Sequence, residues 1–304
     1  MEHRIVSLLP SATEIVAALG RGGQLVGRSH ECDHPRQVVD LPVVSRPRRE
    51  PVGSSHDIHR GVVDLLTRVL SIYRVDPDAL AAADPDLIIT QDLCRVCAVA
   101  EDEVVRAARS YLDRDVDVLT SSPMTLREVF ADVVRIADAL DDRTAGERLV
   151  DRMQTELDDL SASVAGRRRP RLALLEWTDP VMAGGNWAPE LVEIAGAEPV
   201  LGVPGGHSPT VTSEALRACD PDVIVIAPCG FHLDRAVADR HILAALDGWQ
   251  DLSAVRSGRV AFADGSAYFN RPGPRLITSA AILVAVAHGV GPAMPLEGDA
   301  WQRW

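Results

Sequence analysis

An Asp-Pro-Asp triplet followed by an apolar run occurs twice in this chain, and this repeat limits the possible folds more than any other feature. The first copy, DPDLII, covers residues 84–89, and the second, DPDVIV, covers residues 220–225. Each copy follows an Ala-rich stretch and leads into a segment that carries cysteine. A helix–strand unit that recurs within 304 residues indicates two similar lobes, and the chain is long enough for both to bury a core.

The segments around each copy alternate between strand and helix patterns. In the first half, RIVSLLP (4–10) is a short apolar run, and SATEIVAALG (11–20) has a helix pattern with Ser11 as its expected N-cap. The second half restarts the alternation at RLALLEW (171–177). Such alternation is typical of parallel sheets covered by helices, so we expect two doubly wound α/β lobes.

The middle of the chain follows a helical pattern, with an expected break at Asp141-Asp142. Its second part carries an apolar stripe at helical spacing, formed by Leu149, Met153, Leu157 and Leu160. This stripe predicts a long backbone helix over most of residues 144–164. The predicted domains are an N-terminal α/β lobe (1–123), a helical linker (124–168) and a C-terminal α/β lobe (169–304) with an irregular tail from Gly291.

Charge and composition exclude several functions. The net charge is −13, which disfavours non-specific binding to nucleic acid. The chain has no lysine, so Schiff-base catalysis and a Walker-type phosphate loop are excluded. The N-terminal run IVSLL is shorter than the roughly 7–15 apolar residues of a secretory signal, and no stretch approaches the roughly 20 of a membrane span. We therefore expect a cytoplasmic protein without membrane insertion, and a periplasmic or extracellular one only if a leader was removed.

Reactive and aromatic residues gather after the predicted strands. Ligands of open α/β sheets bind outside the carboxyl ends of the strands, so we expect these segments to line one cleft between the lobes. The segments are SHECDHP (29–35), QDLCRVC (91–97), EWTDPVMAGGNW (176–187), PCGFH (228–232) and DGSAYFNRPGPR (264–275). The candidate ligand-binding residues are Pro10, Ser11, His30, Asp33, Glu176, Trp177, Trp187, Phe231, Tyr268, Phe269 and Arg271.

The cysteines in these segments leave several chemistries open. Cys32, Cys94, Cys97 and Cys229 are candidate metal ligands, because converging thiolates suit zinc or an iron–sulfur cluster. A redox dithiol is the alternative for the C-x-x-C pair, and free thiols that fill space under the loops are another. Flat aromatic side chains in the same segments suit a planar ligand, although packing within each lobe explains them equally well.

The chain resembles a family of transport receptors along most of its length. The stretches RIVSLLPSATEIVAALG, LVGRSHECDHP, DPDLIIT, VTSEALRACDPDVIVI and YFNRPGPRLI are similar to those of cobalamin-binding receptors of vitamin B12 ABC transporters. These belong to the class III, helical-backbone superfamily, which also binds haem, siderophores and metal ions. The resemblance implies two α/β lobes on one rigid helix, with the ligand between them. Residues 46–72 look like an insertion relative to compact transport receptors.

Two functions follow as expectations. The first is a binding protein for cobalamin or a related metal chelate, and the resemblance then implies Asp78 and Glu214 as acids for docking on an ABC permease. The alternative is a cytoplasmic metalloenzyme with a Cys-ligated metal or an iron–sulfur cluster in the same cleft.

Overall fold

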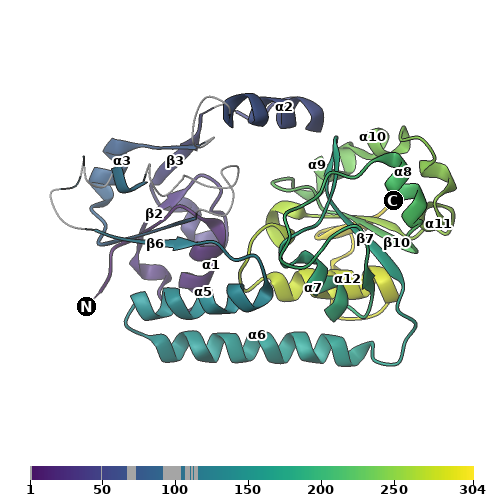
Figure 1. The fold of residues 1–304 in the computed structure, drawn as a ribbon. Coiled ribbons are helices and arrows are strands. Elements are labelled where there is room, and N and C mark those ends of the chain that lie inside the picture. Colours follow the sequence, from purple (N-terminus) through teal and green to yellow (C-terminus); the bar gives the residue numbers. More distant parts are fainter. Residues whose placement is uncertain are drawn as a thin grey trace. The chain divides into compact units, whose positions relative to one another are not determined.

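The computed structural model describes residues 2–48, 50–66, 73–91, 104–106, 110, 112 and 116–304. Its contacts divide the chain into two units, here called the first and second lobes (Figure 1). The first lobe comprises Met1–Val52, Arg60–Pro123 and Arg127–Asp151, and the second comprises Gly53–His59, Met124–Leu126 and Arg152–Trp304.

The first lobe is built on a six-stranded sheet in the order β4-β3-β2-β1-β5-β6. All neighbouring strands are parallel except β4, which is antiparallel to β3. The chain adds β2, β3 and β4 on one side of β1, and β5 and β6 on the other. Its elements are β1 (Ile5–Ser7), α1 (Pro10–Ala18), β2 (Leu25–Ser29), β3 (Val43–Pro47), α2 (Ser55–Leu66), β4 (Tyr73–Val75), α3 (Pro77–Ala83), β5 (Leu87–Gln91), β6 (Asp117–Ser121) and α5 (Leu126–Ala139), with short 3-10 turns at Gly22–Gln24 and Arg36–Asp40.

The second lobe holds the second sheet, with the order β12-β11-β10-β7-β8 and β9 beside β7. Its strands β7, β10 and β11 are parallel and form the centre of the core, where β10 is fully buried. Its elements are β7 (Arg171–Thr178), β8 (Val181–Ala183), α7 (Ala188–Ile194), β9 (Glu198–Pro199), α8 (Ser213–Cys219), β10 (Val223–Ile226), α9 (Leu233–Ala238), α10 (Arg240–Ala244), α11 (Ser253–Arg256), β11 (Val260–Ala263), a π-helical turn (Gly265–Phe269), α12 (Leu276–His288) and β12 (Trp301–Arg303), with 3-10 turns at Trp249–Asp251 and Met294–Leu296.

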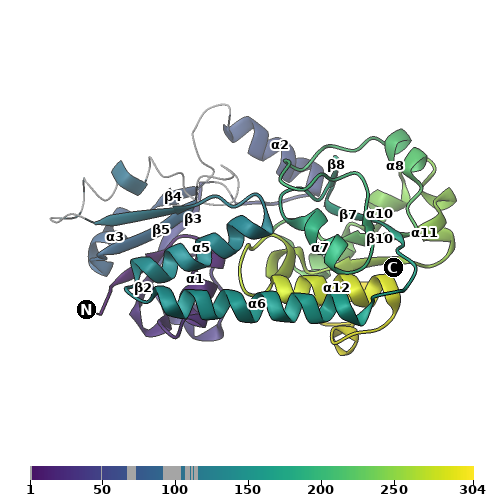
Figure 2. The ribbon, with the colours of Figure 1, turned by 60° about the horizontal axis from the view of Figure 1, so that its bottom comes forward.

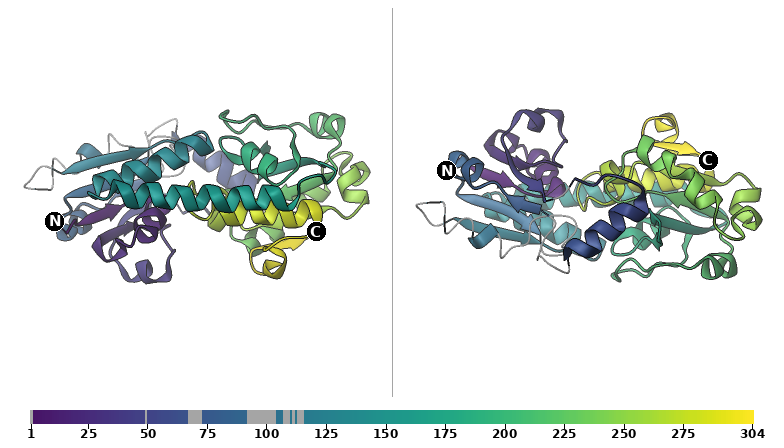
Figure 3. Two further views of the ribbon diagram at one scale, coloured as in Figure 1. Left: turned by 90° about the horizontal axis from the view of Figure 1, so that it is seen from below. Right: turned by 90° about the horizontal axis from the view of Figure 1, so that it is seen from above.

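The predicted backbone helix is confirmed as α6 (Arg143–Ser163), which Figure 2 shows as one unbroken helix. All four residues of the predicted apolar stripe are buried. α5 lies against the first half of α6, and Gly146 permits this approach because a Cβ there would be 2.5 Å from the Cβ of Ala137. α12 runs beside the second half of α6 (Figure 3). Among the helices that the structure describes, none has the length and apolar character that crossing a membrane requires.

The repeated Asp-Pro-Asp phrase forms the same structure in each lobe. Its first aspartate ends a helix in the left-handed region, with φ of 43° at Asp84 and 36° at Asp220. Its second aspartate accepts a hydrogen bond from the backbone amide of an arginine at the start of the neighbouring strand. The carboxylate of Asp86 thus lies 3.0 Å from the amide nitrogen of Arg4 in the first lobe.

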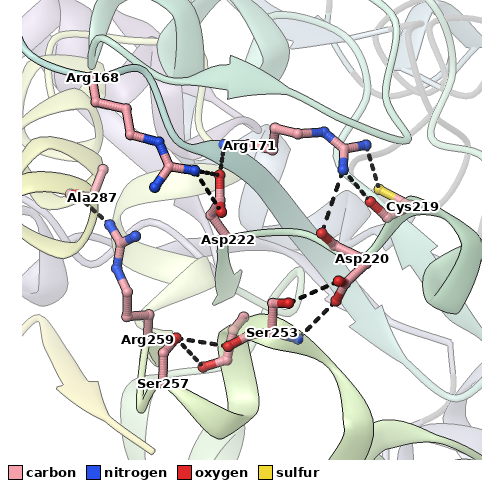
Figure 4. Close-up of polar contacts among 10 residues, drawn as sticks. Arg168, Arg171, Cys219, Asp220, Asp222, Ser253, Ser257, Arg259 and Ala287 are labelled. Atoms are coloured by element: carbon pink, nitrogen blue, oxygen red, sulfur yellow. Dashed lines mark hydrogen bonds and ion pairs between the residues drawn. The ribbon is translucent and has the colours of Figure 1, made fainter.

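In the second lobe the carboxylate of Asp222 lies 2.9 Å from the amide nitrogen of Arg171 (Figure 4). The guanidinium of each arginine also donates to a carbonyl at the end of the helix that leads into the Asp-Pro-Asp phrase, namely that of Asp84 for Arg4 and that of Cys219 for Arg171. Arg168 adds a second donor to Asp222 at 3.0 Å. The sequence repeat therefore marks one supersecondary unit used twice, which confirms the predicted pair of α/β lobes.

Two local features differ from expectation. Helix α1 begins at Pro10 with Leu9 as its N-cap, and Ser11 is a buried helical residue. Proline is favoured at the first helical position because its fixed φ suits the helix and it has no N–H to satisfy. The tail from Gly291 is also more ordered than expected. Its strand β12 pairs with β11, and the indole of Trp301 is fully buried and donates to the Ala293 carbonyl at 2.9 Å.

Candidate functional site

The carboxyl ends of the strands in the first lobe gather the predicted residues of the N-terminal half. β1 lies between β2 and β5 and is parallel to both, so the segments that follow these strands leave the sheet at the same edge. Pro10 and Ser11 follow β1 and are buried at the start of α1. Asp33 follows β2 and is exposed. Cys94 and Cys97, which follow β5, lie outside the described residues.

Among the described residues of this edge, His30 is the one best suited to bind a metal centre. Its Nδ1 lies 3.1 Å from the Ser45 carbonyl, which can only accept, so Nδ1 carries the proton. Burial lowers the pKa of His30 below its usual value, so the ring is neutral at neutral pH and Nε2 keeps its lone pair. The ring packs against Tyr73 with 5.0 Å between centroids, and its side chain remains 25% exposed.

Cys32 occupies a different environment from His30. It is 1% exposed, and its Sγ lies 3.0 Å from the hydroxyl of Thr13 and 3.8 Å from the Ser7 carbonyl. Within the described ranges, no three His, Cys, Asp or Glu side chains are grouped so that they could hold a metal ion. A site that joins Cys32 to Cys94 and Cys97 stays a prediction, because two of its three thiols are not described.

In the second lobe, an aromatic pair follows the central strands. Trp177 near the end of β7 and Phe231 after β10 lie 5.0 Å apart at 49°, a tilted arrangement. The guanidinium of Arg235 covers the Phe231 ring at 4.3 Å. Trp177 is partly exposed and donates from Nε1 to the Asp179 carbonyl at 3.0 Å, whereas Phe231 is only 7% exposed. The pair combines an apolar face with a cation, which suits a flat ligand that carries acidic groups.

Glu176 lies beside this pair on β7 and holds two loops. Its carboxyl group interacts with the hydroxyl of Ser208 and the amide of Gly185. Burial raises the pKa of Glu176, although both of these hydrogen bonds favour the carboxylate. Its backbone carbonyl accepts from the amide of Cys229 at 2.9 Å, so Cys229 is fixed beside it and is partly exposed.

The segment after β11 brings the remaining predicted residues to the same edge of the second sheet. Asp264 accepts from the amide of Ala267 at 2.6 Å and lies 3.0 Å from Nδ1 of His232. The turn then packs directly on the loop after β10, because a Cβ at Gly265 would lie 2.1 Å from the Pro228 carbonyl. The predicted residues within and after this turn differ in exposure: Tyr268 is partly exposed, Phe269 is 7% exposed and Arg271 is 4% exposed.

Trp187 lies in the loop between β8 and α7, where it forms the N-cap residue of α7. It is 5% exposed, and its Nε1 has no hydrogen-bond partner among the described residues. Trp187 is therefore a buried packing residue in this structure. Its contact with a ligand stays a prediction.

Sequence reasoning missed a buried polar chain at the end of β7. The hydroxyl of Thr178 lies 2.6 Å from the carboxylate of Asp239, which is 2% exposed and ion-paired with Arg235. Ser55 lies 2.9 Å from the same hydroxyl. The i, i+4 spacing of Arg235 and Asp239 was visible in the sequence, but nothing in it linked them to Thr178 or Ser55.

Comparison with known proteins identifies the class that this fold represents. The model of the periplasmic binding protein family matches residues 5–267, and the chain belongs to this family. It is 24% identical over 280 residues to the vitamin B12-binding protein of Vibrio parahaemolyticus, covering 91% of this chain and 86% of that protein.

Solved structures agree on the fold. The periplasmic heme-binding protein BhuT, in complex with two hemes, matches with a TM-score of 0.68 and 23% identity, covering 94% of this chain and 97% of BhuT. The periplasmic vitamin B12-binding protein BtuF of Vibrio cholerae matches with a TM-score of 0.65 and 22% identity, covering 94% and 96%. These findings confirm the resemblance inferred from sequence. They do not support the metalloenzyme, the iron–sulfur cluster, the zinc site or the intracellular setting.

Proposed function

We propose that this protein binds a corrinoid or a related tetrapyrrole metal chelate through the strand-end segments of its lobes. Family membership over residues 5–267 supports a binding role, and relatives matched along most of the chain are named for vitamin B12. The observation that carries the proposal is the Trp177–Phe231 pair with Arg235 above it. The partly exposed Trp177 offers ring surface to a macrocycle, and Arg235, which covers Phe231, places a positive charge beside it for polar edges of the ligand.

The first lobe contributes different chemistry to this proposal. A neutral His30 with an unprotonated Nε2 is a good ligand for the metal at the centre of a chelate. Its Nδ1 donates to the Ser45 carbonyl, and this bond fixes the ring orientation, as hydrogen bonds to metal-binding histidines commonly do. Aromatic side chains in one lobe and a neutral histidine in the other each suit a metallated macrocycle better than a simple ion.

A binding titration tests the proposal. Cyanocobalamin and haemin are added separately to the purified full chain, and absorbance and heat of binding are recorded. We expect at least one of them to bind and Trp177→Ala to weaken binding by about 1–3 kcal/mol, the range of an interface anchor. Trp177→Phe is the matched control, because it keeps a ring at this position and should lose less. Failure of both chelates to bind the wild-type protein would reject the proposal.

We further propose that the protein works outside the cytoplasmic membrane together with an ABC permease. The heme- and B12-binding neighbours are named as periplasmic proteins. Asp78 and Glu214 are the second residues of α3 and α8, the helices of the repeated unit, and both are exposed. Two acids at equivalent positions of two lobes suit a pair of basic docking sites.

Two measurements test this part. Fractionation of cells that express the native gene should recover the protein outside the cytoplasmic membrane. Asp78→Ala/Glu214→Ala should weaken binding to the permease in lipid nanodiscs, most clearly at low salt, whereas Asp40→Ala/Asp299→Ala removes two other exposed acids and should not. Equal binding by both double variants would contradict the docking role.

A further inference from the structure

A segment of the expected insertion lies on the second lobe, although its flanking residues belong to the first. Gly53–His59 makes its contacts with the second lobe, while the chain on both sides of it, up to Val52 and from Arg60, belongs to the first. This segment includes the first turn of α2, which is dark blue in the right-hand view of Figure 3. We call Gly53–Ile58 the latch.

The latch is anchored by buried polar contacts. Ser55 is 0% exposed, and its hydroxyl lies 2.9 Å from that of Thr178. Because a carboxylate only accepts, the proton of Thr178 goes to Asp239, and Ser55 donates to Thr178. Arg235 completes the chain, since it is ion-paired with Asp239 and donates to the Gly53 carbonyl at 3.2 Å.

The local sequence shapes the latch for this position. Ser54 and Asp57 form reciprocal bonds at the start of α2, as in a capping box: the Asp57 amide donates to the Ser54 hydroxyl at 3.2 Å, and the Ser54 amide donates to the Asp57 carboxylate at 3.1 Å. Gly53 has a φ of 111°, which favours glycine. Ile58 then packs against the apolar core of the second lobe, and His56 lies 3.4 Å from the carboxylate of Asp179.

The latch and the proposed ligand surface depend on the same side chain. Arg235 both covers the ring of Phe231 at 4.3 Å and holds the Gly53 carbonyl. Phe231 is 7% exposed, so a ligand that stacks on it has to move the guanidinium aside. That movement breaks the bond to Gly53 and weakens the buried chain that ends at Ser55. A ligand stacked on Phe231 therefore competes with the latch for Arg235 and loosens its anchorage, although Ser55 and Ile58 keep their other contacts.

We propose that the latch is an autoinhibitory contact that competes with the metal chelate for the aromatic surface of the second lobe. This inference rests on the proposed function, since it regulates the same surface. A ligand that binds only the released form sees its apparent affinity reduced by the released fraction. Release of the latch should thus raise the association rate and the affinity by one common factor and leave the dissociation rate unchanged.

The test compares Ser55→Asp with wild type. The new carboxylate would face the buried Asp239, so the anchored state should be strongly disfavoured. We expect the association rate and the affinity for haemin or cyanocobalamin to rise about tenfold or more, in proportion to the released fraction. Val52→Asp is the matched control, because it adds the same charge at a side chain that is 79% exposed, and it should behave like wild type.

Hydrogen exchange without ligand separates this inference from the proposed function. Ser55→Asp should speed exchange of the amides of residues 55–59, whereas unchanged exchange would show that the latch is not anchored there. Faster exchange with an unchanged association rate would overturn the competition. Equal increases in the association and dissociation rates of the ligand would also overturn it, because they indicate a lid over bound ligand. Should Ser55→Asp unfold the lobe, Ile58→Ala serves for the same comparison. If no protein binds either chelate, the proposed function and its regulation are both rejected, while the exchange data still decide whether the latch is anchored.

Discussion

Removing the second aspartate of each repeat should destabilise the two lobes unequally. In Asp222→Ala, the amide of Arg171 loses its acceptor in a part-buried position. In Asp86→Ala, the amide of Arg4 loses its acceptor where water can replace it. An unsatisfied buried donor costs about 1–3 kcal/mol, so we expect about 2 kcal/mol for Asp222→Ala and less than half of that for Asp86→Ala.

The hydrogen bond from the Arg171 amide, and not the ion pair with Arg168, should account for this loss of stability. Arg168 also donates to Asp222, but its side chain is 77% exposed, and ion pairs of exposed groups contribute about 0–1 kcal/mol. Arg168→Ala should therefore cost well under 1 kcal/mol. For a lobe of this size, a loss of 2 kcal/mol corresponds to a fall of about 4–8 °C in the melting temperature.

Lobe-resolved hydrogen exchange by mass spectrometry in urea is the appropriate assay, because two lobes need not unfold in one step. Asp299→Ala and Asp40→Ala, at exposed acids of the second and first lobes, are the controls. The reasoning fails if Asp222→Ala matches Asp299→Ala. It also fails if Arg168→Ala costs as much as Asp222→Ala, since the ion pair would then be the main contribution.

Three further predictions concern the strand-end residues. Burial raises the folded-state pKa of Glu176, so its contribution to the free energy of unfolding is complete below the usual carboxyl pKa of about 4–5 and is lost as pH rises through the folded-state pKa. Glu176→Gln should therefore flatten the pH dependence of the melting temperature. An unchanged pH dependence would contradict this assignment. His30→Ala should abolish the spectral shift of bound haemin that signals histidine ligation, whereas an unaltered spectrum would show that His30 does not bind the metal. Cys32→Ser, Cys94→Ser and Cys97→Ser should each lower bound metal in anaerobically purified protein if these thiols form a site, and wild-type metal and ligand binding in all three would show that they are structural.

Sequence reasoning succeeded where the signal was local. The stripe from Leu149 to Leu160 predicted α6 because one face of an amphipathic helix repeats every three or four residues. The Asp-Pro-Asp phrase predicted the repeated unit because a left-handed aspartate and a strand start are encoded within a few neighbouring residues. The class of fold and the receptor family followed from these features together with the resemblance.

Prediction was weaker where a structure depends on distant partners. The edge strands β4 and β12 have three residues each, too few for an alternating pattern to stand out. The pairing of Ser55 with Thr178 joins residues 123 positions apart, and no local pattern encodes it. The exposure of aromatic residues was equally hidden, since Trp177 and Trp187 lie in the same predicted segment (176–187) but differ in burial.

The two lobes differ in what they keep and what they change. At the amino ends of their strands, Asp86 and Asp222 make the same bond to the backbone amide of an arginine, and this bond joins two neighbouring strands in each lobe. At the carboxyl ends, one lobe offers His30 and the other offers Trp177 and Phe231. Under the proposed function, His30 is the candidate metal ligand of one lobe and the aromatic pair is the candidate ring surface of the other. This division predicts that substitutions at His30 alter the metal spectrum of a bound chelate, whereas substitutions at the aromatic pair alter affinity for the macrocycle whether or not it carries a metal. Metal-free protoporphyrin distinguishes the two, since its binding should respond to Trp177→Ala and remain unchanged in His30→Ala.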